Sequence, residues 1–113
     1  MKRWFLLAAF AAAATASAHH GWSEYDTDKP LQLNGTIQEA GYVQPHGWIR
    51  LKSAGKTWLV VLAPPGRMES RGLPRDRLAV GASAIVYGYP HRTRLDEMRA
   101  ERITIGGKTT ELR

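Results

Sequence analysis

The stretch TWLVVLAPPGRMESRG, at positions 57–72, decides the expected fold of this 113-residue chain. Its first seven residues are almost continuously apolar, which is typical of a strand with both faces covered. Two prolines end that strand, and proline near a helix start with glycine near its end predicts a short helix over 65–72. Met68 is the expected core contact of this helix. A strand that runs into a short helix midway along a small chain favours an OB-like barrel.

Alternating apolar and polar residues predict strands on both sides of this segment. Two precede it and three follow it, and Gly106-Gly107 permits the positive φ angles that a tight turn before the last strand needs. The expected class is therefore mainly β, a small five- to six-stranded OB-fold-like barrel with one short helix between strands 3 and 4. The alternative is another small barrel in which segment 65–72 is only a loop. The further strands are expected at 31–38, 48–52, 83–89, 98–105 and 108–112.

The last hairpin predicts its own register. A two-residue turn at 106–107 sets Thr104 opposite Thr109 and Arg102 opposite Glu111. The first is a pair of hydroxyls and the second is a pair of opposite charges. Both are favourable neighbours across an antiparallel pair of strands.

The N-terminus has the three parts of a secretory signal peptide. Two basic residues come first, an apolar stretch too short to span a membrane follows, and small residues suit a signal peptidase. We therefore expect 1–18 to be a cleaved signal-peptide helix and the mature protein to be periplasmic or secreted. The alternative, a retained anchor helix, is disfavoured by the short apolar length. Residues 19–30 are expected to form an extended arm, docked by Trp22 and Tyr25, and 31–113 the barrel domain.

Composition limits the classes of function. There is no cysteine, so disulfides and thiolate chemistry are excluded. The net charge of +6 falls to about +4 without the two basic residues of the signal peptide, and charges of both signs are interspersed. This modest bias, in an exported protein, argues against a nucleic-acid partner. No second apolar stretch is long enough for a membrane span. Because the protein is expected to be exported, its expected partner is a ligand or a protein of the cell envelope.

Four short motifs occur together along nearly the whole chain. They are Ala18-His19-His20, Pro45-His46, Gly88-Tyr89 and Ala100-Glu101-Arg102. In this combination the chain resembles an uncharacterised family of small exported bacterial proteins with a signal peptide, a mature Ala-His-His start and an OB-like barrel. Gln44 departs from the asparagine that is more usual before the Pro-His pair. The family has no assigned activity, so the resemblance implies a fold and an export address and leaves function open.

The four histidines, His19, His20, His46 and His91, are candidate metal ligands. Cleavage after Ala18 would let the terminal amine and the imidazole of His19 chelate one metal ion, with a further imidazole completing a T-shaped nitrogen site that suits copper. Cleavage two residues earlier would place histidine third, where amine, backbone nitrogens and imidazole wrap a divalent copper or nickel ion. The alternative is that the paired histidines are ordinary polar residues of an arm, and that His46 and His91 serve a turn and a loop.

The second strand offers a different candidate site. One face of it presents Trp48, Arg50 and Lys52, an aromatic ring and two cations at period-two spacing. OB-type barrels bind ligands on this face, and such groups suit sugars, nucleotides or polyanions. The expected ligand of an exported protein is an envelope polysaccharide, a peptide or a partner protein. The alternative is that Trp48 belongs to the core or covers a barrel end.

Recognisable catalytic motifs are missing from the sequence. There is no cysteine nucleophile, no Gly-x-Ser-x-Gly elbow, and no glycine-rich phosphate loop between a strand and a helix. Asp96 and Glu97 are adjacent in an expected loop, where solvation keeps both carboxylates ionised. We therefore expect a binding or accessory protein that is not an enzyme.

Overall fold

The structure is a computed structural model, and it describes residues 21–113. The predicted signal peptide, with His19 and His20, lies outside the described residues. Residues 21–113 form six strands, one α-helix and two 3₁₀ helices. In chain order they are η2 (Trp22–Glu24), β1 (Leu31–Gly41), β2 (Trp48–Ser53), β3 (Lys56–Val61), α2 (Pro65–Ser70), η3 (Arg75–Arg77), β4 (Ser83–Pro90), β5 (Glu97–Ile105) and β6 (Lys108–Glu111).

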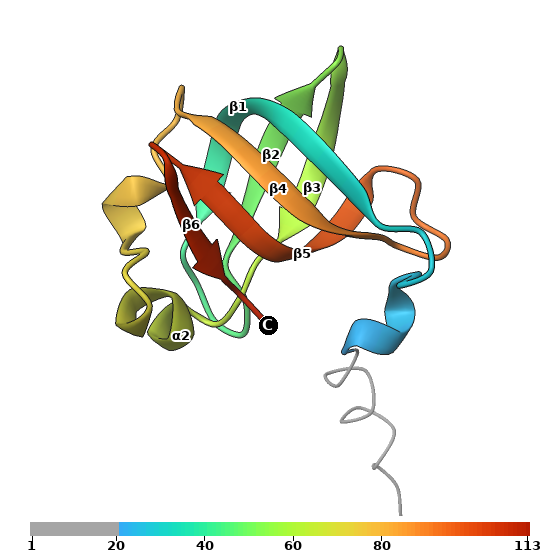
Figure 1. The fold of residues 1–113 in the computed structure, drawn as a ribbon, viewed down its shortest axis with the longest axis horizontal. Helices are drawn as coiled ribbons and strands as arrows, with labels where there is room; N and C mark the ends of the chain where they lie inside the picture. The colour runs from blue at the N-terminus through green and yellow to red at the C-terminus, as the bar shows by residue number, and fades with distance from the viewer. Residues whose placement is uncertain (1–20) are drawn as a thin grey trace, which may run out of the picture.

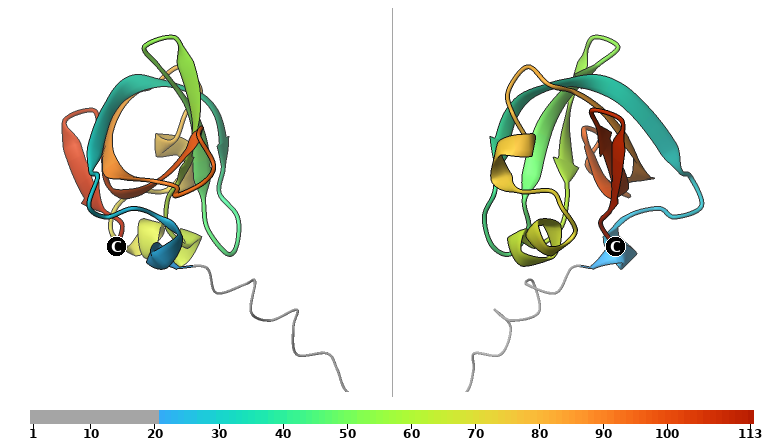
Figure 2. Two further views of the ribbon diagram at one scale, coloured as in Figure 1. Left: turned by 90° about the vertical axis from the view of Figure 1, so that its right-hand side faces the viewer. Right: turned by 60° about the vertical axis from the view of Figure 1, so that its left-hand side comes forward.

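Five of the strands close into a barrel, which Figure 1 shows from the side and the left view of Figure 2 shows more nearly along its axis. Their hydrogen-bonded order is β3-β2-β1-β4-β5, and a parallel pairing between β3 and β5 closes the ring. β6 pairs with β5 outside the ring, and α2 lies at one end of the barrel. The mainly β class, the five-strand barrel with an outer strand, and the short α-helix between strands 3 and 4 are confirmed.

The helix α2 is shorter than predicted and ends at Ser70 rather than at Gly72. Pro65 occupies its first turn, where no backbone N–H is needed, and Met68 is fully buried, as expected. The N–H of Gly72 donates to the carbonyl of Glu69, and its φ of +87° turns the chain out of the helix. The alternative of a plain loop is therefore wrong.

The expectation that the third strand is covered on both faces is also wrong. Val60 points into the barrel and is fully buried, whereas Leu59 and Val61 are only half-buried on the outer face. β3 has a bonded neighbour on each side, but a barrel wall has an inside and an outside. The apolar outer residues of β3 therefore belong to an open surface.

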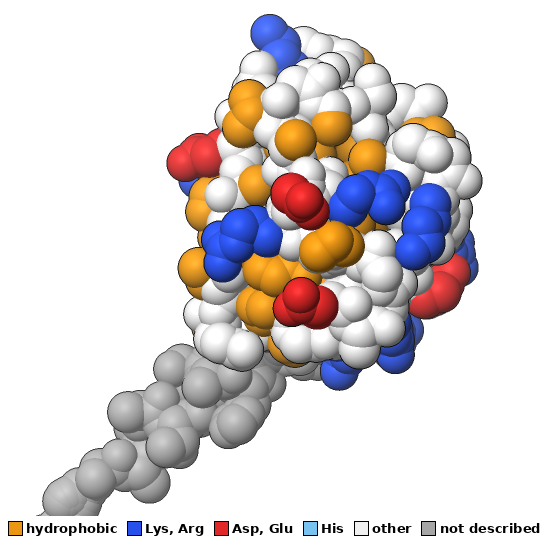
Figure 3. Space-filling model, turned by 90° about the vertical axis from the view of Figure 1, so that its left-hand side faces the viewer, with side chains coloured by type: hydrophobic (Ala, Val, Ile, Leu, Met, Phe, Trp, Pro, Cys, Tyr) orange, Lys and Arg blue, Asp and Glu red, His pale blue; other side chains and the backbone are white. Residues whose placement is uncertain are grey.

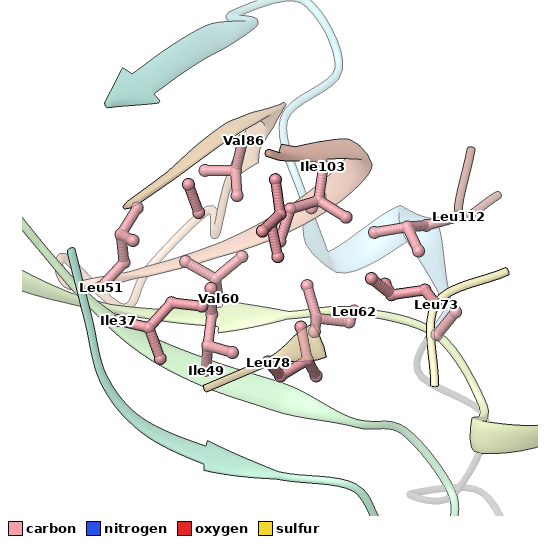
Figure 4. Close-up of a cluster of buried hydrophobic side chains, with 14 of the residues drawn as sticks. Ile37, Ile49, Leu51, Val60, Leu62, Leu73, Leu78, Val86, Ile103 and Leu112 are labelled. Carbon is pink, nitrogen blue, oxygen red and sulfur yellow. The ribbon is translucent and has the colours of Figure 1, made fainter. Parts of the chain in front are cut away.

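The inward side chains of the barrel form its hydrophobic core (Figure 4). Ile49 and Leu51 of β2 are fully buried in it, so their neighbours along the strand point outward. Burial of such aliphatic side chains stabilises the fold by about 1.5–3 kcal/mol each. The core also contains Ile37, Val60, Leu62, Leu73, Leu78, Val86, Ile103 and Leu112.

The predicted register of the last hairpin is confirmed. Thr104 is paired with Thr109 and Arg102 with Glu111. The two threonine hydroxyls lie 2.7 Å apart, and Nε of Arg102 donates to the Glu111 carboxylate at 3.1 Å. Side-chain chemistry and turn length together set this pairing.

The surface carries charges of both signs. Figure 3 shows this on the side where α2 lies in Figure 1, with basic, acidic and apolar side chains interspersed. No helix within residues 21–113 is both long enough and apolar enough to cross a membrane.

Candidate ligand-binding groove

A groove runs over the outer face of β2 and β3. Its first part has a volume of about 320 Å³, and a second hollow of about 350 Å³ shares Arg50 and Leu59 with it. The second hollow continues toward the loop that precedes β5, so the two form one elongated surface. Pro45, His46, Gly47, Trp48, Arg50, Leu59 and Val61 line the first part, and Arg50, Thr57, Leu59, Arg94, Leu95, Asp96 and Glu97 line the second.

The strand register arranges the groove residues in rows across the sheet. Trp48 pairs with Val61, and Val61 pairs with Arg99. This row places an aromatic ring, an aliphatic side chain and a guanidinium on three adjacent strands. Because neighbouring strands lie about 4.8 Å apart, the backbones of Trp48 and Arg99 are roughly 10 Å apart. The next row consists of Arg50, Leu59 and Glu97.

The three residues predicted to bind a ligand share the outer face of β2. Ile49 and Leu51 alternate with them and are fully buried. Trp48 and Arg50 line the groove, whereas Lys52 is exposed further along the same face. The ring of Trp48 therefore lies on the outside of the barrel wall and not in the core.

The Trp48 ring is held in a defined place. Its indole lies against Gly41, where a side chain would collide with the ring atoms. The guanidinium carbon of Arg50 lies 5.9 Å from the indole centroid, and its Nε lies 3.3 Å from the Glu39 carboxylate. The groove therefore presents a half-buried aromatic ring whose neighbouring cation is itself positioned.

His46 lies in the groove beside a buried arginine. Nη2 of Arg99 donates to Nε2 of His46 at 3.3 Å, which requires the imidazole to be neutral at that nitrogen. Burial, followed by the charges of Arg99 and Arg67, lowers the pKa of His46 below its ordinary value. The neutral imidazole has one lone pair, on Nε2, and this lone pair already accepts the hydrogen bond from Arg99.

Arg99 is the functional candidate that sequence reasoning missed. Its side chain points to the outside of β5 yet is only 7 % exposed. The guanidinium carbons of Arg99 and Arg113 each lie 4.5 Å from the centroid of the Trp22 ring, so the N-terminal segment covers it. Alternation along β5 places Arg99 on the outer face, but only the tertiary structure brings Trp22 over it.

The N-terminal segment docks on the barrel through both of its aromatic residues. It begins with a 3₁₀ turn, η2, rather than as a fully extended arm. Trp22 meets Tyr89 edge-to-face at 6.0 Å, and the buried Tyr25 hydroxyl donates to the Glu97 carboxylate at 2.6 Å. Burial and this bond raise the pKa of Tyr25. Glu97 also accepts from Arg94 at 3.1 Å. This buried carboxylate of β5 therefore connects the N-terminal segment with the loop that precedes β5.

His91 belongs to a different hydrogen-bond network from that of His46. Its Nδ1 accepts from the backbone N–H groups of Thr93 and Arg94, at 3.1 and 3.0 Å. Its Nε2 then carries the proton and donates to Glu24 at 3.2 Å. Both ring nitrogens are therefore engaged, and His91 serves to order its loop.

Of the four predicted metal ligands, the structure describes His46 and His91, and these two have different hydrogen-bond partners. Within residues 21–113, no three histidine, aspartate or glutamate side chains are placed to hold a metal ion together. His46 is in the groove, His91 is in the loop after β4, and the remaining pair lies outside the described residues.

The closed barrel, its outer strand and its aromatic and cationic groove define a small β-barrel protein. Residues 7–98 match the family of unknown function DUF6152, and the chain belongs to that family. The expected membership of an uncharacterised family is confirmed at this level, while the signal peptide and the histidine start stay predictions. The comparison with curated proteins found no match.

Solved structures of an RNA-modifying enzyme share the fold. The complex of TiaS with its tRNA, AMPCPP and agmatine matches with a TM-score of 0.54 and 19 % identity, over 72 % of this chain and 19 % of that one. A TiaS mutant lacking its ZRD, bound to agmatine, matches with a TM-score of 0.54 and 20 % identity, over 78 % and 25 %. This chain spans about a fifth to a quarter of those proteins, and the likeness concerns the fold alone.

Proposed function

We propose that this chain is an exported, non-catalytic binding protein that holds a polysaccharide of the cell envelope in the groove over β2 and β3. The observation that carries the proposal is the half-buried Trp48 ring, set beside Arg50 in the hollow that the apolar side chains of Leu59 and Val61 also line. An aromatic face stacks on the flat apolar side of a sugar, and the neighbouring cation orients polar groups. The elongated shape of the two joined hollows suits a chain molecule.

A Trp48→Ala protein is expected to bind an acidic oligosaccharide about tenfold more weakly than the wild type, because it loses the stacking surface. Isothermal titration with hexagalacturonate as the probe measures this. Tyr87→Ala is the matched control, since Tyr87 makes the same kind of contact with Arg102, at 4.5 Å, elsewhere on the barrel. Equal affinities for the wild type and the folded Trp48→Ala protein would reject the groove as the binding surface.

Copper binding by the mature N-terminus is a second candidate function, supported by the position of His46 beside the residue that the N-terminal segment covers. Trp22 lies against Arg99, and Arg99 contacts His46. In a mature protein that starts at His19, the terminal amine and the first imidazole would supply two nitrogen donors, and His46 is the candidate for the third.

A His19→Ala substitution in the mature protein is expected to lower the affinity for divalent copper about a hundredfold, because it removes one of two chelating nitrogens. Intact mass first establishes that the terminus is His19, and competitive titration with copper alone gives the affinities. Arg99→Gln is expected to raise the affinity, since it frees Nε2 of His46. His91→Asn serves as the control outside the site, and copper affinity that does not change in His19→Ala would end this proposal.

A further inference from the structure

Arg99 carries an unsatisfied polar group in a nearly closed environment. Its Nε is buried and has no hydrogen-bond partner in the structure. Within residues 21–113 its guanidinium contacts the imidazole of His46 and the ring of Trp22, and neither is an anion. Leaving a buried donor unpaired destabilises the folded protein, and more so when the group is charged.

The surroundings of Arg99 add to its positive charge. Burial is the main cause that lowers the pKa of Arg99, Tyr25 acts in the opposite direction, and the charges of Arg67 and Arg113 lower the pKa further. Arg67 reaches over from α2 and uses its Nη1 on the carbonyl of Leu112. Arg113 has an acidic partner in Glu101, at 3.6 Å, whereas no carboxylate in the described part of the chain lies within ion-pair distance of Arg99 or Arg67. The cluster therefore has an excess of positive charge that an anion would neutralise.

We propose that Arg99 binds a carboxylate of the groove ligand, so that the ligand is an acidic polysaccharide. Nε lies on the same edge of the guanidinium as Nη2, and Nη2 has a second proton beyond the one it donates to His46. That edge therefore matches the two oxygens of a carboxylate. Arg99 also shares its cross-strand row with Trp48, within the width of one or two sugar rings.

Entry of the carboxylate requires a local movement. Nε is closed off from solvent, and the ring of Trp22 lies over the guanidinium. Trp22 belongs to η2, a 3₁₀ turn of three residues that precedes the buried anchor Tyr25. A shift of η2 opens the guanidinium edge while Tyr25 keeps the segment attached. This inference rests on the proposed function, because it names the charged group of the ligand that the groove holds.

Arginine Nε–H resonances of the ¹⁵N-labelled protein test the inference directly. Adding hexagalacturonate is expected to move the Arg99 Nε–H signal downfield, as a new charge-assisted hydrogen bond does. Sodium acetate, compared with sodium chloride at equal ionic strength, is expected to move the same signal, since it carries only the carboxylate. An Arg99 signal that responds to neither probe overturns the proposal, and this measurement needs no variant to fold.

Variants then separate this inference from the proposed function. Arg99→Gln and Arg99→Lys are both expected to weaken hexagalacturonate binding about tenfold, because neither offers the two-donor edge. Arg102→Gln removes the same charge from another surface and is expected to have no effect. Binding that is lost in Trp48→Ala but kept in folded Arg99→Gln leaves the groove and removes the carboxylate site. An acetate response without hexagalacturonate binding leaves the carboxylate site and removes the polysaccharide groove.

Discussion

A Gly88→Ala protein is expected to lose about 3 kcal/mol of its free energy of unfolding. Gly88 lies on β4, opposite Ala100 of β5 and next to a shift in the register of the two strands. A Cβ at this position would collide with the carbonyl oxygen of Arg99 and lie 2.8 Å from the Cα of Ala100. Both are backbone atoms, which cannot move aside as a flexible side chain can. β4 and β5 must therefore separate locally, where the barrel wall also carries Arg99.

Urea unfolding followed by circular dichroism measures the effect. A domain of this size has a total stability of only about 5–15 kcal/mol, so the expected loss is a large fraction. Gly66→Ala is the matched control, because nothing lies within 4 Å of its added Cβ and the site is in α2. That control is expected to stay within about 1 kcal/mol of the wild type. Equal stabilities of the two variants would show that β4 and β5 tolerate the added methyl group.

The strands and their order follow from local signals. Period-two alternation predicts β1, β2 and β4, a continuous apolar run predicts β3, and the hairpin turn at 106–107 predicts β5 and β6. A proline pair predicts the start of α2, and a Gly-Gly turn sets the register of the last hairpin down to Thr104 and Thr109. The ends of elements were predicted less well. α2 stops at Ser70, two residues early, and β1 runs on to Gly41.

The sequence also predicted which residues of β2 point outward, but it did not predict that they line a groove. Alternation puts Trp48, Arg50 and Lys52 on one side of the strand. Whether that side is open depends on what β3 and β5 place beside it. An apolar run such as that of β3 looks the same in a strand covered on both faces and in a barrel strand whose outer residues line a groove.

Arg99 shows what local pattern cannot supply. It stands in a strand pattern as one of several outward arginines, and arginines on outer faces are usually solvated. Its burial comes from Trp22, which is 77 positions earlier in the chain, and its contact with His46 comes from the parallel pairing of β3 with β5. The candidate site at Arg99 therefore depends on contacts between residues that are far apart in the chain. The charge composition indicated only a modest positive bias.

The buried carboxylate of Glu97 is expected to contribute most to holding the N-terminal segment over Arg99. A Glu97→Ala substitution leaves the Tyr25 hydroxyl buried without its acceptor, 2.6 Å away in the wild type, and takes the partner of Arg94 away. The expected cost is about 2–4 kcal/mol, which combines a lost charged hydrogen bond with an unsatisfied buried hydroxyl. Tyr25→Phe removes the hydroxyl as well as its bond, so it is expected to cost less, about 1–2 kcal/mol.

A double-mutant cycle decides whether the two residues act as a pair. If the bond between Tyr25 and Glu97 is the source of the effect, the double variant is less destabilised than the sum of the single ones, by about 1 kcal/mol or more. Glu111→Ala is the control, because its carboxylate is 59 % exposed and its pair with Arg102 is expected to contribute within about 1 kcal/mol. Release of η2 would also move the Trp22 ring away from the guanidinium, so the fluorescence of Trp22 is expected to change in Glu97→Ala and not in Glu111→Ala. Additive effects with unchanged fluorescence would mean that the aromatic contacts of Trp22, and not this carboxylate, position the segment that covers Arg99.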